Sequence, residues 1–404
     1  MYKKACFLCN SKKLKKILDF GSQPWCNDFL KKNQLGLEKK YPLYVNFCKN
    51  CSNVQLGYIL KKTKMFSNHN YLSGSNQELI NHFKKISYKI LNIFPKKKFS
   101  ILDIGSNDGS FLKNFKNDKN INILGIESCK KISNIASMQQ VKTVNKFFNY
   151  KNALKLDNKL EGFDCIHASG VFFHLEELIS ATKAIKYILK NDGVFIIQFL
   201  YLKNIIKRNH FDQFYHEHLN YYNLEPLERF LNSYDLEIYD AEKSSIHGGS
   251  IIAYVCHKGL RKKTKKLLNL LNLENQKKIN NIKFYLDFKN KIMKLKLKFK
   301  RKIDFFKKRN FNIYGIGAPA KSSTLIHYFG INNNDIKFTT ENNHLKINKY
   351  LPGSHIKILD EKKLSKKISF TKDIFLIFSW NFKNNIIKKY KKKFGNSFRY
   401  FLPY

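Results

Sequence analysis

The chain has 404 residues, of which 43% are hydrophobic and 15% aromatic, so it is long enough for about two or three folded domains. Its formal net charge is +45, from 75 Lys and Arg against 30 Asp and Glu, and charge alone would favour a nucleic-acid partner. The basic residues are almost all Lys and are spread along the whole chain, whereas Arg is the usual residue for bidentate phosphate and base contacts. We therefore expect no nucleic-acid partner, and a surface potential that attracts small anions such as nucleotide diphosphates.

Nothing in the sequence indicates export or membrane insertion. The first nine residues lead directly into polar sequence, without the apolar core of a signal peptide. No apolar run reaches the roughly 18 residues that a transmembrane helix needs. Eight Cys without an export signal favour metal binding in a reducing compartment, so we expect a cytoplasmic protein.

The first segment carries two Cys-x-x-Cys pairs, Cys6 with Cys9 and Cys48 with Cys51. Strand patterns lie between the pairs, near residues 16–20 and 43–47. Four thiolates can surround Zn²⁺ tetrahedrally and leave no open position, so such a metal holds the fold and does not catalyse. The spacing predicts a structural zinc domain over residues 1–65, and the alternative is two unrelated pairs of free thiols.

Strand and helix patterns alternate through residues 66–260. Helical patterns cover Gln77–Phe94, Ser110–Phe115 and Leu175–Leu189, and strand patterns cover Ser100–Ile104, Ile121–Ile126, Phe163–His167 and Gly193–Phe199. This alternation predicts an α/β domain of Rossmann type, with a parallel sheet and helices on both faces.

The remaining chain is expected to form a linker and a second, smaller α/β domain. Residues 261–300 have the apolar spacing of one long helix or a pair of helices. Residues 301–404 then repeat a strand, a glycine loop and a helix from Phe311 to Thr324. Further strands are expected over Ile336–Thr340 and Asp373–Ser379.

The first central strand runs into the loop Asp103-Ile-Gly-Ser-Asn-Asp-Gly109, where glycines allow a ligand to approach the backbone. Glu127 ends the next strand, at a position where a carboxylate can bind both ribose hydroxyls. The loop lacks the glycine spacing of dinucleotide sites and the Gly-Lys-Ser/Thr of phosphate loops, which favours S-adenosylmethionine. The alternative is a plain strand, turn and helix. The expected cofactor contacts here are Asp103, Gly105, Ser106, Asn107, Gly109 and Glu127.

Residues 214–218 read Phe-Tyr-His-Glu-His and place a phenol, a carboxylate and two imidazoles within four positions. That mixture favours proton transfer beside the bound cofactor, although a single His is often a hydrogen-bonded core or surface residue. Further along, Gly315-x-Gly317 precedes Lys321 at an expected helix start. Backbone N–H groups together with an ammonium suit a diphosphate.

Over nearly its full length the chain resembles the sugar C-methyltransferases of deoxysugar biosynthesis, which act on nucleotide-diphosphate keto sugars. The motifs above take part in the match, in order along the chain. Others are Leu18–Trp25 with Asn27, Tyr71–Ser75, His174 in Val-Phe-Phe-His, His247–Ser250, Tyr350–His355 and Trp380-Asn381.

The resemblance implies a mechanism and residue roles. In that family a base removes the proton next to the sugar ketone, and the enolate attacks the methyl group of S-adenosylmethionine. The matching residues here are His218 as base, and Tyr215 and His174 as hydrogen-bonding partners of the ketone oxygen, with His216 pointing away. Glu217 either orients His218 or pairs with its cation.

The resemblance also implies binding roles outside the acid/base cluster. Tyr71 and Ser73 match positions that close over the cofactor. The sugar nucleotide is expected to contact His247, Gly315, Gly317 and Lys321, which places its binding in the C-terminal domain.

The chain departs from the family pattern at three positions. Ile252 and Gly170 stand where Arg and Asn are common, and Glu341 stands where Asp is common. Two other classes remain as alternatives: a nucleic-acid methyltransferase, for which the chain lacks an Asn/Asp-Pro-Pro-Tyr motif, and a non-catalytic zinc-knuckle binding protein. The same site could also serve a different acceptor.

Overall fold

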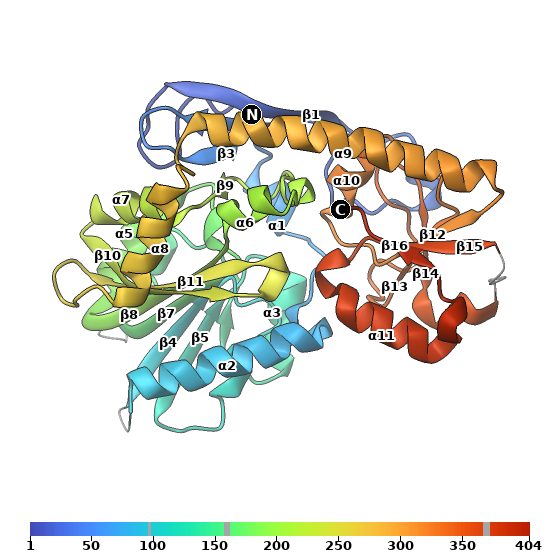
Figure 1. Ribbon diagram of the computed structural model, residues 1–404. Coiled ribbons are helices and arrows are strands. Elements are labelled where there is room, and N and C mark those ends of the chain that lie inside the picture. The colour runs from blue at the N-terminus through green and yellow to red at the C-terminus, as the bar shows by residue number, and fades with distance from the viewer. Residues whose placement is uncertain (96–97, 157–161, 367–371) are drawn as a thin grey trace.

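The computed structural model describes residues 1–95, 98–156, 162–366 and 372–404, and within these ranges the strands form three sheets. Figure 1 shows the N-terminal sheet above the central one, with the C-terminal sheet beside it. The long helix α9 runs over the top from the central part to the C-terminal part.

The N-terminal sheet is antiparallel and contains a strand from the acid/base segment. Its order is β1 (Leu14–Pro24), β2 (Lys40–Cys48), β3 (Val54–Leu56) and β9 (Asn220–Tyr221). Gln55 pairs with Asn220, two residues after His218. The zinc-domain strands therefore continue directly into the segment that carries the histidines.

The central sheet has the order β10, β11, β8, β7, β4, β5, β6. The bounds are β4 (Phe99–Ile104), β5 (Ile121–Ile126), β6 (Thr143–Val144), β7 (Phe163–Ser169), β8 (Leu189–Leu200), β10 (Leu236–Ser244) and β11 (Ser250–His257). The strands from β6 to β8 are parallel, but β11 is antiparallel to both neighbours. The prediction of a parallel sheet is wrong at the edge where β11 runs opposite to β10 and β8. Only a short turn joins β10 to β11, and a parallel pair needs a crossover.

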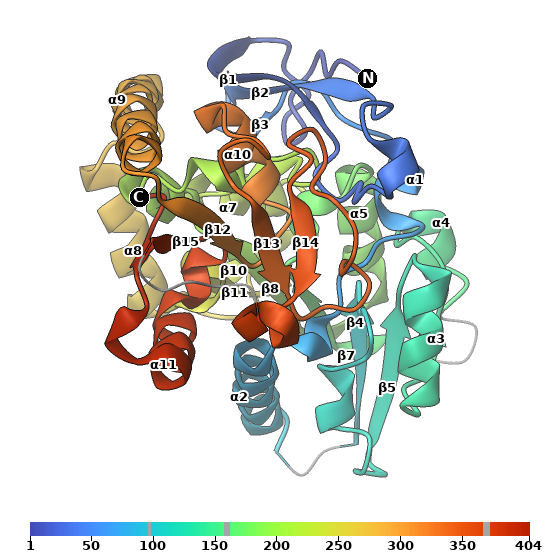
Figure 2. The same ribbon diagram turned by 90° about the vertical axis from the view of Figure 1, so that its right-hand side faces the viewer.

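Helices cover both faces of this sheet, as predicted. Ile101 packs in one apolar cluster with α2 (Gln77–Ile93), whereas Leu102 packs in another with α5 (Leu178–Ile188). Successive strand residues point to opposite faces, so a run of apolar residues supplies both layers. Figure 2 shows α2 and α3 (Lys130–Met138) flanking the strands. The shorter helices of this part of the chain are α1 (Lys62–Phe66), α4 (Tyr150–Ala153), α6 (Leu202–Lys207) and α7 (Leu224–Asn232).

The helix expected over Ser110–Phe115 does not form. A short 3-10 turn, Leu112–Asn114, takes its place. Asn114 donates side-chain hydrogen bonds to the backbone carbonyls of Ser110 and Phe111, which competes with helical pairing.

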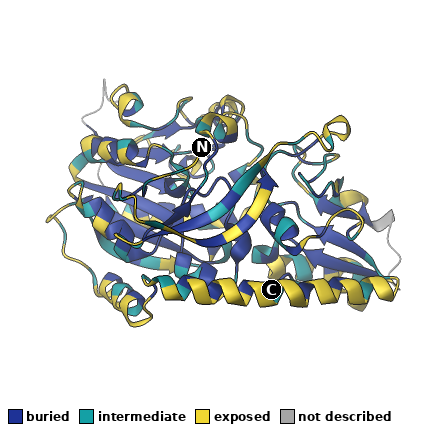
Figure 3. Ribbon diagram, turned by 90° about the horizontal axis from the view of Figure 1, so that it is seen from above, coloured by how far each residue is buried: buried dark blue, intermediate teal, exposed yellow. Residues whose placement is uncertain are grey.

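The linker is a pair of helices, α8 (Lys265–Gln276) and α9 (Ile282–Lys308). Asn281 caps the start of α9 by accepting the N–H of Lys283. The buried residues of α9 recur every three, four or seven positions, at Tyr285, Phe288, Ile292, Phe299 and Ile303, and so form one apolar face. Figure 3 shows the opposite face of α9 exposed, which accounts for the many Lys residues of this segment.

The C-terminal sheet is parallel and has the order β14, β13, β12, β15, β16. The strands are β12 (Asn312–Ile316), β13 (Phe338–Glu341), β14 (Lys357–Asp360), β15 (Asp373–Ile377) and β16 (Tyr400–Phe401), covered by α10 (Ser322–Phe329) and α11 (Lys383–Phe394). The chain runs from β12 to β14 on one side and then crosses to β15, so the strand order reverses between β12 and β15. Ligands of open α/β sheets bind at such a reversal, outside the carboxyl ends of the strands.

Candidate active site

A cavity of 810 Å³ lies between the central and C-terminal sheets and is lined by residues of all three parts of the chain. The carboxyl ends of β4 and β5 contribute Gly105 and Glu127, and the carboxyl ends of β12 and β13 contribute Gly317 and Glu341. His174 and His218 line the same cavity. A second hollow of 1560 Å³, along α5, holds none of the acid/base residues.

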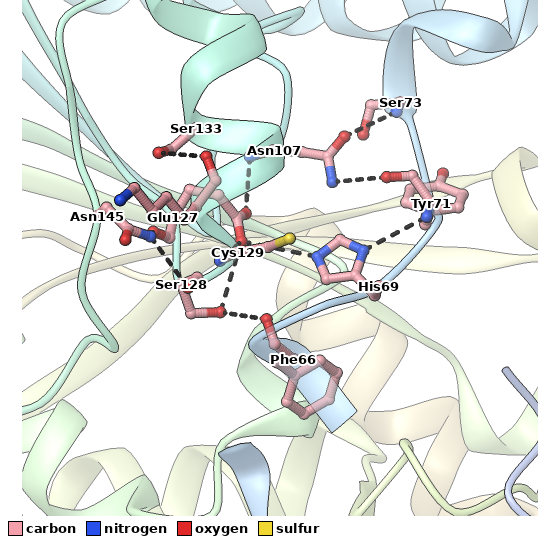
Figure 4. A network of polar contacts seen from close by, with 11 residues as sticks. Phe66, His69, Tyr71, Ser73, Asn107, Glu127, Ser128, Cys129, Ser133 and Asn145 are labelled. Atoms are coloured by element: carbon pink, nitrogen blue, oxygen red, sulfur yellow. Dashed lines mark hydrogen bonds and ion pairs between the residues drawn. The ribbon is translucent and has the colours of Figure 1, made fainter. Parts of the chain in front are cut away.

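The loop after β4 is fastened to the segment around residue 71. Asn107 accepts the backbone N–H of Ser73 at 2.9 Å and donates to the carbonyl of Tyr71 at 3.2 Å (Figure 4). Gly105 has φ +69°, and a side chain there would meet Val171 at 2.5 Å. Glycine therefore allows both the turn and the close approach of this loop to its neighbour.

Glu127 is oriented by backbone donors at the end of β5. It accepts the N–H of Asn107 at 3.1 Å and of Cys129 at 2.8 Å, and His69 Nε2 lies 3.6 Å from its Oε1 (Figure 4). A fixed carboxylate beside a glycine loop fits the ribose of S-adenosylmethionine, which brings an electrophilic methyl group when bound. Tyr71, Ser73, Gly105, Asn107 and Glu127 line the cavity and would hold that cofactor.

Three residues that were expected to contact the cofactor do not line the cavity. Asp103 is buried and its Oδ1 is 2.8 Å from His167 Nδ1, so the pair supports the end of β4 from inside. Burial raises the pKa of Asp103, and His167 opposes that rise. Ser106 packs over Gly125, and Gly109 lies against Val141, which leaves neither in the cavity wall.

His218 is buried at the cavity wall, and its ring centroid lies 3.9 Å from the ring centroid of Tyr215. Its Nδ1 lies 2.9 Å from the backbone carbonyl of Gln213. A carbonyl only accepts, so Nδ1 carries the hydrogen and Nε2 of the neutral ring keeps its lone pair. Burial lowers the pKa of His218 well below its usual value, and His174 adds to the effect, so the ring is neutral at pH 7.

His174 has the same tautomer. Its Nδ1 lies 2.5 Å from the carbonyl of Glu217, and burial lowers its pKa to about 4. The neutral ring can accept through Nε2 but cannot donate there, so it does not suit the role of a donor to a ketone oxygen. Tyr215 does, because burial raises the pKa of its phenol well above the usual value and keeps the O–H.

Glu217 does not orient His218, contrary to expectation. Its Oε1 accepts Trp25 Nε1 and Asn27 Nδ2, each at 2.7 Å. Burial raises the pKa of Glu217, and these two donors oppose the rise. The sequence motif contained Trp25 and Asn27, but nothing in it indicated that they reach a carboxylate in the central part of the chain.

The segment of residues 213–221 is anchored from several sides. Gln213 donates to the carbonyl of His247 at 3.1 Å, and Thr324 of α10 donates to the carbonyl of Phe214 at 2.8 Å. The ring of His216 points away from the cavity, toward the carbonyl of Tyr41 at 3.3 Å. The two histidines of this segment therefore face different surroundings.

The C-terminal side of the cavity contains a buried ammonium. Lys321 Nζ donates to Asn381 at 2.8 Å and lies 3.5 Å from the ring centroid of Trp380. Burial lowers the pKa of Lys321 to about 8, and Asp212 opposes this shift. Gly317 has φ +84°, and a side chain there would collide with Ser379, so this loop also requires glycine.

The other two expected substrate contacts differ in position. His247 lines the cavity with a left-handed backbone, φ +57°. Gly315 lies inside β12, one residue before the strand ends, and a side chain there would meet Thr339 and Phe378. It supports the sheet and does not line the cavity.

The two Cys-x-x-Cys pairs come together as one group. The four sulfurs of Cys6, Cys9, Cys48 and Cys51 lie within 4.8 Å of one another. Four thiols in a closed set are the donors that structural zinc prefers, so these residues fit the metal.

In the part of the chain that the structure describes, no helix is long and apolar enough to cross a membrane.

Three family models match successive parts of the chain. A zinc binding domain matches residues 6–66, a methyltransferase domain 64–241, and a C-methyltransferase C-terminal domain 245–403. The C-methyltransferase NovU of Streptomyces niveus is 23% identical over 401 residues, covering 98% of this chain and 94% of that protein.

Solved structures also match part of the chain. One is an S-adenosylmethionine-dependent methyltransferase from Clostridium acetobutylicum (TM-score 0.36, 16% identity, 45% of this chain and 92% of that chain). Another is the PH0226 protein from Pyrococcus horikoshii (TM-score 0.38, 18% identity, 49% of this chain and 100% of that chain). The three family models and the full-length relative agree with the resemblance seen in the sequence. The chain therefore belongs to the family of S-adenosylmethionine-dependent C-methyltransferases with an N-terminal zinc-binding domain.

Proposed function

We propose that this enzyme methylates the ring carbon next to the ketone of a nucleotide-diphosphate keto-deoxysugar, by way of an enolate. The observation that carries the proposal is the neutral His218 at the cavity wall: its Nδ1 is held by the Gln213 carbonyl, which leaves the Nε2 lone pair free, and its ring centroid lies 3.9 Å from that of Tyr215. A ketone makes the neighbouring C–H acidic, and removing that proton needs a base and a partner for the developing oxyanion.

The roles follow from the tautomers. His218 Nε2 takes the proton, and its Nδ1–H continues to donate to the Gln213 carbonyl, so the charged ring stays oriented. Tyr215 donates its O–H to the enolate oxygen, where negative charge develops. His174 lies with its ring centroid 5.0 Å from that of His218 and accepts a sugar hydroxyl through Nε2. Bound S-adenosylmethionine would supply the methyl group: the new carbon–carbon bond would form as the methyl–sulfur bond breaks, which would leave S-adenosylhomocysteine and restore the ketone.

The two ends of the cavity fit the two ligands. Residues 66–260 hold S-adenosylmethionine at Glu127, and residues 301–404 hold the diphosphate near Gly317 and Lys321, with residues 261–300 as the link. A buried ammonium beside backbone N–H groups suits a diphosphate.

Hydrogen exchange tests this proposal without needing the methyl donor. A panel of nucleotide-diphospho-4-keto-6-deoxy sugars is incubated with the enzyme in D₂O and analysed by mass spectrometry, with and without S-adenosylmethionine. We expect deuterium next to the ketone without the cofactor and methyl gain with it. His218→Asn should slow both by roughly 100-fold to 10,000-fold.

His216→Asn is the matched control, because that imidazole belongs to the same segment and points away from the cavity. It should keep both activities. Neither exchange nor methyl gain on any sugar of the panel would contradict the proposed substrate class. Equal losses in the two variants would contradict the assignment of the base.

A further inference from the structure

The cavity contains two copies of one local arrangement, and Glu341 occupies in the second copy the place of Glu127 in the first. In the first copy the N–H of Gly105 donates to the carbonyl of Ile126 at 2.8 Å, directly before Glu127. In the second, the N–H of Gly317 donates to the carbonyl of Thr340 at 2.8 Å, directly before Glu341. Glu127 follows Gly105 by 22 residues, and Glu341 follows Gly317 by 24.

Backbone donors orient the two carboxylates in the same way. Oε2 of Glu127 accepts the N–H of Asn107 at 3.1 Å, and Oε2 of Glu341 accepts the N–H of Ala318 at 3.1 Å. Oε1 accepts N–H groups just beyond the strand in both, from Cys129 at 2.8 Å and from Asn342 at 2.8 Å. An acid held at this point of a Rossmann-type unit binds ribose hydroxyls.

The second copy also has cations that suit phosphates. Lys321 is buried at the cavity wall, next to the Gly317 loop. Lys346 is buried as well; its Nζ donates to the carbonyl of Ala318 at 3.0 Å and lies 3.8 Å from Glu341. A carboxylate for ribose and an ammonium for phosphate, side by side at the strand reversal, match a nucleoside diphosphate.

We propose that Glu341 binds the ribose of the substrate's nucleoside, so that the enzyme selects a ribonucleoside diphosphate sugar over its 2′-deoxy counterpart. This rests on the proposed function, since it assumes that the substrate carries a nucleoside diphosphate. Backbone N–H groups orient both oxygens of Glu341. Oε1 accepts those of Asn342 and, at 3.2 Å, Asn343, whereas Oε2 accepts that of Ala318 and has lone-pair capacity left for a ribose hydroxyl. A 2′-deoxyribose offers only one of the two adjacent hydroxyls and leaves the partly buried carboxylate with one donor fewer.

Calorimetric titration tests this with nucleotides that differ by one oxygen atom. The probes are UDP and dUDP, GDP and dGDP, and CDP and dCDP, together with dTDP. For the base that binds, we expect the ribo form to bind roughly tenfold to a hundredfold more tightly, as for a hydrogen bond to a charged group. Glu341→Gln should reduce this ratio to near one and leave the affinity for S-adenosylmethionine unchanged.

Two matched variants locate the effect. Glu127→Gln should weaken S-adenosylmethionine binding and keep the ribo-to-deoxy ratio. Glu361→Gln, which removes another carboxylate of the same cavity wall, should also keep the ratio.

Equal affinity of the wild-type enzyme for the ribo and deoxy forms would overturn the inference and leave the proposed function intact. So would a ratio that survives in Glu341→Gln, or one that is lost only in Glu361→Gln. Failure to bind any nucleoside diphosphate would overturn the proposed substrate class and this inference together. The wild-type comparison is decisive even if a variant folds poorly.

Discussion

Replacing Trp25 by Phe tests whether the zinc-binding segment contributes directly to catalysis. The change keeps an aromatic ring but removes the N–H that donates to Glu217 at 2.7 Å, in a site where Glu217 is buried. A hydrogen bond to a charged group contributes about 1.5–3 kcal/mol, and Asn27 still donates to the same oxygen. The backbone carbonyl of Glu217 also accepts from His174, so a shift of Glu217 would move that ring too. We therefore expect kcat/KM to fall by roughly tenfold to a hundredfold.

The assay is mass-spectrometric methyl transfer to the keto sugar nucleotide, together with a double-mutant cycle. In the Glu217→Gln background the carboxylate charge is already absent, so Trp25→Phe should cost much less than in the wild type. We expect a coupling free energy of at least about 1 kcal/mol. Thermal unfolding of each variant separates loss of activity from loss of fold.

Tyr44→Phe is the matched control, because it removes a donor of the same sheet, from its hydroxyl to the Gly57 carbonyl at 2.9 Å, outside the cavity. Its activity should stay near that of the wild type. Additive effects of Trp25→Phe and Glu217→Gln would refute the reasoning, since the two side chains would then act independently.

Two further predictions concern the metal and the pH dependence. Metal analysis should find one zinc ion per chain. Removing it with a chelator, or changing Cys48 to Ser, should lower the unfolding temperature and abolish activity, because β3 of the zinc domain pairs with β9. Cys256→Ser is the control, and an unchanged unfolding temperature after zinc removal would contradict a structural metal. Lys321 has a pKa of about 8 in the free enzyme, so it is charged below that pH and loses its charge above it. kcat/KM for the sugar nucleotide should therefore fall as the pH rises through about 8. The Lys321→Met variant should have a low kcat/KM at every pH and should not show this fall. The same fall in the variant would mean that another group titrates there.

Several features of the molecule could be predicted from local sequence. The two Cys pairs, the glycine loop that ends at Gly109 and the alternation of strands and helices depend on spacing along a few residues, and that spacing is set by backbone geometry. Two features were missed because a local effect overrides periodicity. A short turn makes β10 and β11 pair antiparallel, and side-chain hydrogen bonds of Asn114 replace the expected helix at Ser110–Phe115 with a short turn.

The acid/base segment could be located from sequence, but not the partner of each side chain. Trp25 and Glu217 are 192 residues apart, and only the pairing of β9 with the zinc-domain sheet brings them together. The tautomers of His174 and His218 are likewise set by carbonyls that the fold places next to Nδ1.

By itself, then, the sequence determined which chemical groups the protein carries and the order of its elements, because both depend on short-range pattern. The tertiary structure decided which groups face the cavity. It buried Asp103 with His167, turned His216 away, and brought Glu341 opposite a second glycine loop. These outcomes depend on packing between distant segments, which leaves no periodic signal in any one of them.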